Sequence, residues 1–346
     1  MLYGKNFIAV LLFCMLCFPS CKKRHHNVTR SFYYWKTIYR PTSYEIHVLH
    51  KLQVGKMYIR LFDVDVDPAT GHIIPIAPIQ FPGKLADTFR VVPVIFITQQ
   101  TLGALGRSPI VPLVEKISTL TESLCSCADI QPSEIQIDCD WTAGTKDVYF
   151  NLLNAIRQQP YFKGKTLSCT IRMHQVKYTL SSGVPPVDKG MLMCYSMGDL
   201  KKTGDRNSIL DVDEAKEYLK RINAYSLPLD IALPVFQWCI LFRGNKYRGI
   251  LHDVAPDMVS SSKLFVHTAG SLYSCTMDTV WQGYQLKAND IIRVESASNS
   301  DLVQVARFTS QQVTNPDVNV AFFSCDSITL SKYSTDELEA VYNTYR

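Results

Sequence analysis

The 346-residue sequence lacks a long hydrophobic run after its N-terminal segment, and no later stretch approaches the roughly 18 consecutive apolar residues of a membrane-spanning helix. It also lacks clustered Lys and Arg interleaved with aromatic residues, and its net charge is only +5, so nucleic acid is not an expected partner. No Gly-rich phosphate loop, G-x-S-x-G elbow or H-E-x-x-H pair occurs. We therefore expect no cofactor and no serine-hydrolase chemistry.

Metal-binding spacings are equally scarce. Cys125-x-Cys127 is the only close cysteine pair after Cys21, and it lacks the two-residue gap of a zinc knuckle. The remaining cysteines fall mostly within apolar runs, which predicts small buried side chains. The run Asp63-x-Asp65-x-Asp67 offers carboxylates to calcium, but it lacks the Gly and terminal Glu of an EF-hand loop. We expect no bound metal.

The N-terminal segment is typical of an exported protein. Lys5 precedes an apolar run over 7–18 (FIAVLLFCMLCF), and at about 1.5 Å per residue this run is too short to span a hydrocarbon core of about 30 Å. The following Phe18-Pro19-Ser20-Cys21 resembles a bacterial lipobox. We predict a signal peptide over 1–20, a lipidated Cys21 and a tether over 21–30. An ordinary secretory signal with an incidental cysteine is the alternative.

The start of the predicted tether is basic. Lys22-Lys23-Arg24 suits the anionic headgroups of a membrane. The surface-export signals of lipoproteins in the Bacteroidota are acidic directly after the lipidated cysteine, and this sequence does not resemble them. We therefore expect an envelope protein anchored to a membrane at Cys21, facing the periplasm rather than the cell surface. The oligomeric state stays open.

From residue 31 onward, short apolar runs alternate with helical patterns. Several runs are apolar on both faces, which is typical of parallel strands covered on both sides. The runs that predict strands are Phe32–Lys36, Met57–Val64, Val91–Ile97, Ile135–Asp140, Leu167–Arg172, Gly190–Tyr195, Leu229–Phe236 and Val318–Ser324. Thr42 with Glu45, and Ser334 with Glu337, have the spacing of helix-capping boxes.

This alternation predicts an α/β fold, a (β/α)8 TIM barrel that forms a single domain over 31–346. A doubly wound open sheet is the alternative, and the missing phosphate loop disfavours it. The stretch between the seventh and eighth strands is too long for a simple crossover, and Arg243-Gly244-Asn245 reads as a hairpin turn. We predict an insertion over about 238–300 at the barrel mouth.

Polar and acidic residues gather where the predicted strands end, which is the end that carries the active site in such barrels. The second strand ends in Asp63 and Asp65, and the fourth in Asp138 and Asp140. The other ends supply further candidates, which are Arg172, His174, Tyr195, Gln237, Trp238 and Asp326. Trp141, Tyr195, Trp238 and Trp281 are candidate sugar platforms, or else large side chains that fill the top of the barrel.

The D-x-D spacing follows from the geometry of a strand. Residues two apart point to the same face, so Asp138 and Asp140 are expected to project together, with Cys139 facing the helices. Two carboxylates this close cannot both ionise cheaply, and either a raised pKa or a nearby cation is required. Arg172 or His174 from the next strand could supply the cation. A purely structural network of buried carboxylates is the alternative.

The pattern I-x-x-D-x-D on the fourth strand, with Met193-Cys194-Tyr195 on the sixth, resembles the family 18 glycoside hydrolases, the chitinase-like barrels. Asp138 and Asp140 match the second and third aspartates of the family's D-G-x-D-x-D-x-E motif, and Tyr195 matches the tyrosine of its M-x-Y-D strand. The sequence departs from the family at Ile135, at Ser196, and at Thr142, which replaces the general-acid glutamate. The chain also resembles barrel lipoproteins of the Bacteroidota.

The resemblance implies a glycan as substrate or ligand. Because Thr142 cannot donate a proton, another acid is needed for hydrolysis; Asp140 is the first candidate, with Asp63, Asp65 and Asp326 as alternatives. The expected catalytic group is Asp138, Asp140, Asp63 and Asp65. The expected substrate-binding group is Tyr195, Trp141, Arg172, His174, Gln237, Trp238 and Asp326. A non-catalytic barrel that binds a glycan or a protein, and a purely structural envelope protein, are the alternatives.

Overall fold

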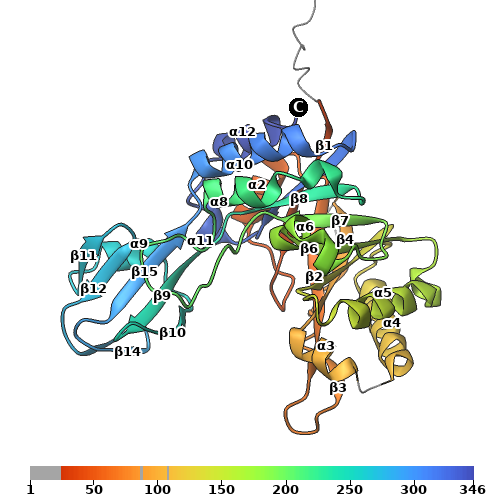
Figure 1. Ribbon diagram of the computed structural model, residues 1–346, viewed down its shortest axis with the longest axis horizontal. Coiled ribbons are helices and arrows are strands. Elements are labelled where there is room, and N and C mark those ends of the chain that lie inside the picture. The colour runs from red at the N-terminus through yellow and green to blue at the C-terminus, as the bar shows by residue number, and fades with distance from the viewer. Residues whose placement is uncertain (1–24, 86–88, 107–108) are drawn as a thin grey trace, which may run out of the picture.

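A computed structural model describes residues 25–85, 89–106 and 109–346 (Figure 1). Eight parallel strands form a barrel in the order β1-β16-β8-β7-β6-β5-β4-β2, and pairing of β1 with β2 closes it. The TIM barrel is thereby confirmed, and the open sheet is excluded. The barrel strands are β1 (Asn27–Tyr34), β2 (Lys56–Val66), β4 (Arg90–Ile97), β5 (Glu134–Cys139), β6 (Thr166–Arg172), β7 (Lys189–Met193), β8 (Leu229–Pro234) and β16 (Asp317–Phe323).

Helices cover the outside of the barrel, and their apolar faces pack on the outward side chains of the strands. Both predicted capping boxes are present, at Thr42 with Glu45 and at Ser334 with Glu337. The α-helices are α2 (Ser43–Lys51), α3 (Gln99–Leu105), α4 (Ile110–Cys127), α5 (Lys146–Gln158), α6 (Met173–Lys177), α7 (Thr179–Ser182), α8 (Val212–Leu219), α9 (Pro256–Ser260), α10 (Asn299–Gln312), α11 (Ser327–Leu330) and α12 (Thr335–Asn343). Short 3₁₀ turns are η1 (Pro160–Phe162) and η2 (Ile222–Ala224).

An irregularity in β2 decides which of its residues face the barrel interior. The register of β2 against β4 shifts between Arg60 and Phe62. Leu61 and Phe62 therefore both pack in the outer core, and the inward series changes from even to odd numbers. As a result, Asp63 and Asp65 point toward the mouth of the barrel, and β2 continues into an antiparallel hairpin with β3 (Ile73–Ile76).

The closed end of the barrel, where the strands begin, holds a buried network of charges. The Lys56 and Lys189 ammonium groups each lie 3.0 Å from Glu134 Oε2, and Lys189 Nζ also lies 2.8 Å from Asp230 Oδ2. Ser168 Oγ donates to Glu134 Oε1 at 2.8 Å. Since buried charges are tolerated only when they are paired, this network fills the bottom layer of the barrel without orphaned ions.

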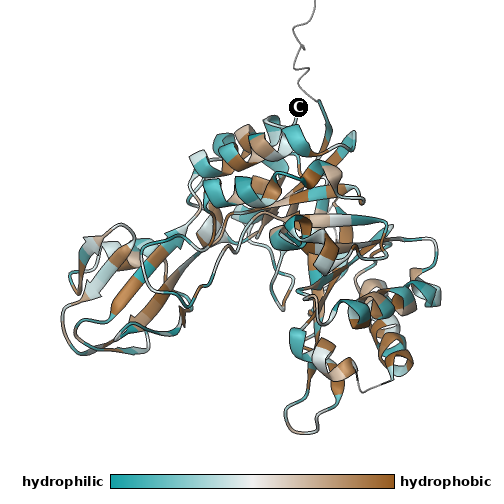
Figure 2. Ribbon diagram, in the orientation of Figure 1, coloured by the Kyte–Doolittle hydropathy of each residue, from teal (hydrophilic) through white to brown (hydrophobic). Residues whose placement is uncertain are grey.

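The predicted insertion between the last two barrel strands is confirmed, and it forms a sheet of its own. Its strands run in the order β10-β9-β15-β12-β11, with a separate hairpin of β13 and β14. Their bounds are β9 (Gln237–Arg243), β10 (Lys246–Leu251), β11 (Phe265–Ala269), β12 (Leu272–Cys275), β13 (Thr279–Trp281), β14 (Tyr284–Leu286) and β15 (Ile291–Ser296). Gly244 and Asn245 have φ of 54° and 58°, the paired positive values that a tight hairpin turn requires. Hydrophobic residues follow the strands of both sheets (Figure 2).

The boundary of the predicted tether needs correction. β1 begins at Asn27, so the last four residues assigned to the tether (27–30) belong to the barrel. Strand pairing to β16 holds them, because Asn27 lies opposite Asp317 in register. The predicted signal peptide and Cys21 lie outside the described residues. Within the described ranges, no helix is long and apolar enough to cross a membrane.

Candidate functional site at the barrel mouth

Asp138 in β5 and Asp140 directly after it point into the barrel mouth and have different partners. Thr170 Oγ1 donates to Asp138 Oδ1 at 2.5 Å. Arg172 donates two hydrogen bonds to Asp140, one of them from Nη2 to Oδ2 at 2.5 Å. Cys139, between the aspartates, is buried in the outer core. Asp140 is therefore held in a bidentate ion pair, whereas a neutral hydroxyl holds Asp138.

The environment of Asp138 favours its protonated form. Burial, helped by the neighbouring Asp140 and Asp63 carboxylates, raises the pKa of this carboxyl to about 6, although Thr170 and Arg172 act to lower it. An ordinary aspartate has a pKa of about 3.9. Asp138 can therefore hold or release a proton near physiological pH, which is the property that acid–base catalysis requires.

Asp63 and Asp65 reach the same mouth from β2. Arg60 donates to Asp63 through Nε at 2.7 Å, and its Nη2 lies 2.6 Å from Asp63 Oδ2. Asp65 accepts from Thr98 Oγ1 at 2.7 Å. Asp67 instead turns back to Thr70 Oγ1 at 2.7 Å, so these three carboxylates do not converge on a calcium ion. Across the described ranges, no group of three or more His, Cys, Asp or Glu is arranged to hold a metal.

Aromatic rings form the floor of the mouth. Tyr195 stacks on Phe323 with ring centroids 5.5 Å apart, and Phe236 lies edge-on to both. Trp35 lies 5.5 Å from Phe323 and extends the floor on the side of β1. Phe96 contacts Trp35 at 6.3 Å. Apart from Tyr195, these rings are partly exposed, so the floor presents apolar faces beside the carboxylates. Sequence reasoning missed every member of this floor except Tyr195.

Arg172, His174 and Tyr195 line one small pocket together with Tyr218. Its volume is about 60 Å³, which is room for only a few water molecules. Burial and the Arg172 cation lower the pKa of His174, so its imidazole is neutral near pH 7. Deep entry of a sugar ring at this point would require the Arg172 side chain to move.

Gln237, Trp238 and Asp326 line a larger pocket of about 390 Å³ between the insertion and the loop after β16. Trp238 Nε1 donates to Glu295 Oε2 at 2.7 Å, and its ring lies 5.1 Å from Phe236. Asp326 caps α11 and pairs with Lys36 at 3.0 Å. This pocket therefore joins the aromatic floor on the side of the insertion.

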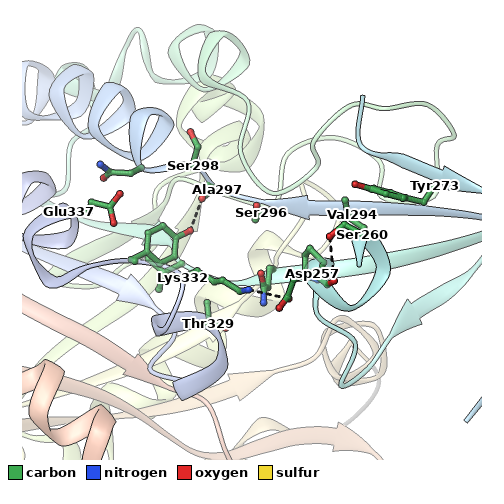
Figure 3. A pocket seen from close by; sticks show the side chains of 15 residues that line it. Asp257, Ser260, Tyr273, Val294, Ser296, Ala297, Ser298, Thr329, Lys332 and Glu337 are labelled. Atoms are coloured by element: carbon green, nitrogen blue, oxygen red, sulfur yellow. Dashed lines mark hydrogen bonds and ion pairs between the residues drawn. The ribbon is translucent and has the colours of Figure 1, made fainter. Parts of the chain in front are cut away.

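A second cavity of the insertion, of about 370 Å³, lies against α10 and α12 (Figure 3). Lys332 Nζ lies 3.0 Å from Asp257 Oδ1 and joins the barrel to α9 across this space. Tyr333 donates to the Ala297 carbonyl at 2.6 Å. Gln237 is the only predicted site residue that lines this cavity, which lies behind the mouth rather than within it.

Two aromatic candidates do not lie in the mouth. Trp141 is only 1% exposed, stacks on Tyr149 at 5.1 Å and donates through Nε1 to the Ser182 carbonyl at 2.9 Å. It is a core residue, and the expectation of a sugar platform there was wrong. Trp281 packs on Phe265 at 4.8 Å within the insertion. Neither ring therefore belongs to the aromatic floor.

No family model matches the sequence, and no curated protein does. Solved structures match it over nearly its whole length. The spore cortex-lytic enzyme SleL of Bacillus megaterium QM B1551 aligns with a TM-score of 0.57 at 11% identity, covering 94% of this chain and 75% of that one. A GH18 chitinase from Cycas revoluta in complex with (GlcNAc)4 aligns with a TM-score of 0.53 at 11% identity, covering 92% and 100%. The chain has a chitinase-like barrel.

A third match is the group IV chitinase of Ostrinia furnacalis in complex with allosamidin, with a TM-score of 0.52 at 8% identity and coverage of 92% and 97%. At these identities the likeness concerns the fold alone. Within this chitinase-like barrel, Thr142 is exposed, and its backbone N–H donates to Thr145 Oγ1 at 2.9 Å. Thr142 supplies no carboxyl, and the carboxylates described above are those of Asp63, Asp65, Asp138 and Asp140.

Removing the Arg172 cation is expected to raise the pKa of Asp138 above about 6, because that cation now lowers it. Arg172→Met should also lower the free energy of unfolding by about 2 kcal/mol. This figure lies between the losses that follow when an exposed and a buried ion pair are broken. A pH titration of the Asp138 carboxyl by NMR, with urea unfolding, measures both effects. His174→Ala is the matched control in the same pocket, and an equal shift in that variant would contradict the assignment to Arg172.

Proposed function

We propose that this protein is a lipid-anchored component of the cell envelope that recognises a glycan at the mouth of its barrel. The observation that carries the proposal is the juxtaposition of a partly exposed aromatic floor with the carboxylates of Asp138 and Asp140. Sugars present apolar faces that pack on aromatic rings, and hydroxyls that bond to carboxylates. The solved chitinase structures with (GlcNAc)4 and allosamidin support an oligosaccharide as the ligand class.

If the protein hydrolyses its glycan, Asp138 is the proposed proton donor. Its pKa of about 6 leaves it partly protonated in mildly acidic medium, as a general acid must be. Asp140, fixed by Arg172, lies beside it and can stabilise positive charge that develops on the sugar ring. Asp63 contributes a further carboxylate from β2, held in place by Arg60.

A non-catalytic barrel is the second candidate, and two observations favour it. Both Asp140 oxygens are occupied by Arg172, and the pocket beside them holds about 60 Å³. Thr142 supplies no carboxyl. Such a barrel would bind a glycan on its aromatic floor and leave the glycosidic bond intact. Hydrolysis and binding measured on the same panel of envelope and host glycans decide between the two candidates.

Trp35→Ala is expected to weaken glycan binding by about tenfold, because it removes a partly exposed ring from the floor of the mouth. Calorimetric titration with the best ligand of the panel measures the change. Trp281→Ala is the matched control, since it removes the same side chain from the insertion. Equal affinities of the Trp35 variant and the wild type would show that the glycan does not bind on this floor.

A further inference from the structure

Both ends of the described chain lie at the closed end of the barrel. The His26 backbone N–H donates to the Tyr345 carbonyl at 2.9 Å, and its ring nitrogens lie 2.9 Å and 3.0 Å from the carbonyl oxygens of Asn315 and Ser310. The chain is therefore fixed from His26 onward. Figure 1 shows β1 and the C-terminus at one side, and the insertion and the β3 hairpin at the other.

The proposed anchor is only a short distance from this fixed point. His26 is five residue steps from Cys21, and at 3.3–3.6 Å per step the chain between them reaches at most about 18 Å. Asp140, directly after β5, lies about 20 Å from Glu134 at the start of that strand, at about 3.3 Å per residue. A lipid on Cys21 thus holds the closed end of the barrel near the bilayer. The mouth is then farther from the bilayer by about the length of the barrel.

Exposed cations lie at the closed end, and two of them are unpaired among the described residues. Arg90 is the first residue of β4, and Lys163 precedes β6; both are exposed, and neither has an ion-pair partner among the described residues. Lys51 ends α2 at the same face, 4.0 Å from Asp336. Each further cation near an anionic bilayer strengthens attachment.

Acidic residues at the same end are mostly neutralised. Each of three carboxylates has a cation within 3.0 Å, in the pairs Asp129–Lys84, Asp188–Arg157 and Glu339–Arg30. Two carboxylates have no cation so close: Asp317 accepts a hydrogen bond from Asn27, and Asp336 lies 4.0 Å from Lys51. Arg90 and Lys163 thus remain as exposed cations without a carboxylate partner among the described residues, and the sequence adds Lys22, Lys23 and Arg24 directly before the described part.

We propose that the closed end of the barrel docks on an anionic lipid surface and directs the mouth away from it. The tether argument rests on the proposed anchor at Cys21, whereas the charge argument rests on the described residues alone. The orientation deepens the proposed function, because a glycan must then reach the mouth from the aqueous side. Glycolipids of the anchoring leaflet are excluded as ligands.

A quenching experiment measures the orientation directly. Cys127 ends α4 at the closed end and is the one exposed cysteine within the described ranges, so it accepts a fluorophore. The full-length acylated protein is reconstituted in vesicles of phosphatidylcholine and phosphatidylglycerol that carry nitroxide-labelled headgroups. Strong quenching is expected for a fluorophore on Cys127. No quenching is expected for a fluorophore at the mouth, attached to residue 142 in the double variant Cys127→Ser, Thr142→Cys. Equal or stronger quenching at the mouth overturns the proposal.

A charge experiment tests the surface without the anchor. Protein that starts at Lys22, and so lacks both the predicted signal peptide and Cys21, is expected to bind vesicles containing phosphatidylglycerol, and Arg90→Glu with Lys163→Glu should weaken this binding at least tenfold. Lys201→Glu with Lys202→Glu makes the same charge change on the exposed loop after β7 and should leave the binding unchanged. An equal loss of binding in both pairs of substitutions, or no binding by the protein that starts at Lys22, overturns the docking surface.

Two further readouts separate this proposal from the ones it builds on. Labelled palmitate is expected on the wild type and not on Cys21→Ser, and its absence from the wild type overturns the tether argument. Glycan binding with its dependence on Trp35 is measured on soluble protein. If the protein binds glycan but its mouth faces the membrane, the proposed orientation is wrong and the proposed glycan binding stands.

Discussion

Replacing Glu134 with Gln is expected to lower the free energy of unfolding by about 3–5 kcal/mol, the cost of leaving buried charges without their partner. Glu134 accepts from Lys56 and lies 3.0 Å from Lys189; without its charge Lys56 loses its ion-pair partner, and Lys189 keeps only Asp230. Gln keeps the size of the side chain and can still bond to Ser168. The loss of stability therefore reports the effect of the charge alone, and urea unfolding at neutral pH measures this loss.

Glu217→Gln is the matched control, because Glu217 pairs with Lys220 on the surface, where both side chains are largely exposed. No measurable change is expected there. A rescue strengthens the test: adding Lys56→Met to Glu134→Gln removes one stranded cation and should recover part of the loss. If Glu134→Gln and Glu217→Gln unfold at the same urea concentration, the network does not stabilise the barrel.

The pH dependence of this effect follows from the direction of the pKa shift. Burial opposes ionisation of Glu134, but the Lys189 and Lys56 cations outweigh it and lower the pKa of the carboxyl. Its stabilising effect is therefore complete above the ordinary value of about 4.3 and is lost as the pH falls through the lower folded value. Burial raises the pKa of Asp230, which has one lysine partner, so Asp230→Asn should cost less than Glu134→Gln.

The sequence located the strands because each is a short apolar run bounded by helical patterns. All eight predicted strands are present, and so are both capping boxes and the hairpin at Gly244 and Asn245. The bulge in β2 left no comparable sign, since Leu61 and Phe62 are both apolar and fit either face. Asp63 and Asp65 reach the mouth only through that bulge.

Strand periodicity also explains which site residues could be predicted. Alternation on adjacent strands predicts the inward positions of Asp138, Asp140 and Arg172. Arg172, which pairs with Asp140, was one of the two cations considered for this site. The same alternation places Trp141 with Cys139 on the outer face, so its burial was already implied by the sequence. The aromatic floor was missed because Phe residues at strand ends look like ordinary core residues until the barrel closes around them.

Asp138→Asn is expected to reduce glycan hydrolysis by about 10²–10⁴-fold, the usual contribution of a general acid, if the barrel is catalytic. Asn keeps the shape and can still bond to Thr170, so glycan affinity should stay within about twofold of the wild type. Wild-type turnover should decline as the pH rises through about 6, since the proton of Asp138 is lost there. Hydrolysis and binding of one glycan across pH 4–8 measure these effects.

The same substitution has a stability effect that does not depend on catalysis. The pKa of Asp138 is raised to about 6 in the folded protein, chiefly by burial. The folded state therefore holds this proton more tightly than the unfolded chain does, and the wild type loses stability as the pH rises from about 4 through about 6. Asn carries no charge, so Asp138→Asn should unfold at a higher temperature than the wild type at pH 8 and at a similar one at pH 4.

Asp140→Asn provides the contrast, because it weakens the bidentate pair with Arg172 and should lower the melting temperature at pH 8. The two readouts together separate the functions that remain. If Asp138→Asn loses hydrolysis but gains stability, Asp138 is a catalytic acid that the protein keeps at the expense of stability, which is common in active sites. If Asp138→Asn is more stable but the wild type binds the glycan without hydrolysing it, the protein is a binding barrel. Full turnover by Asp138→Asn would remove Asp138 from the catalytic group.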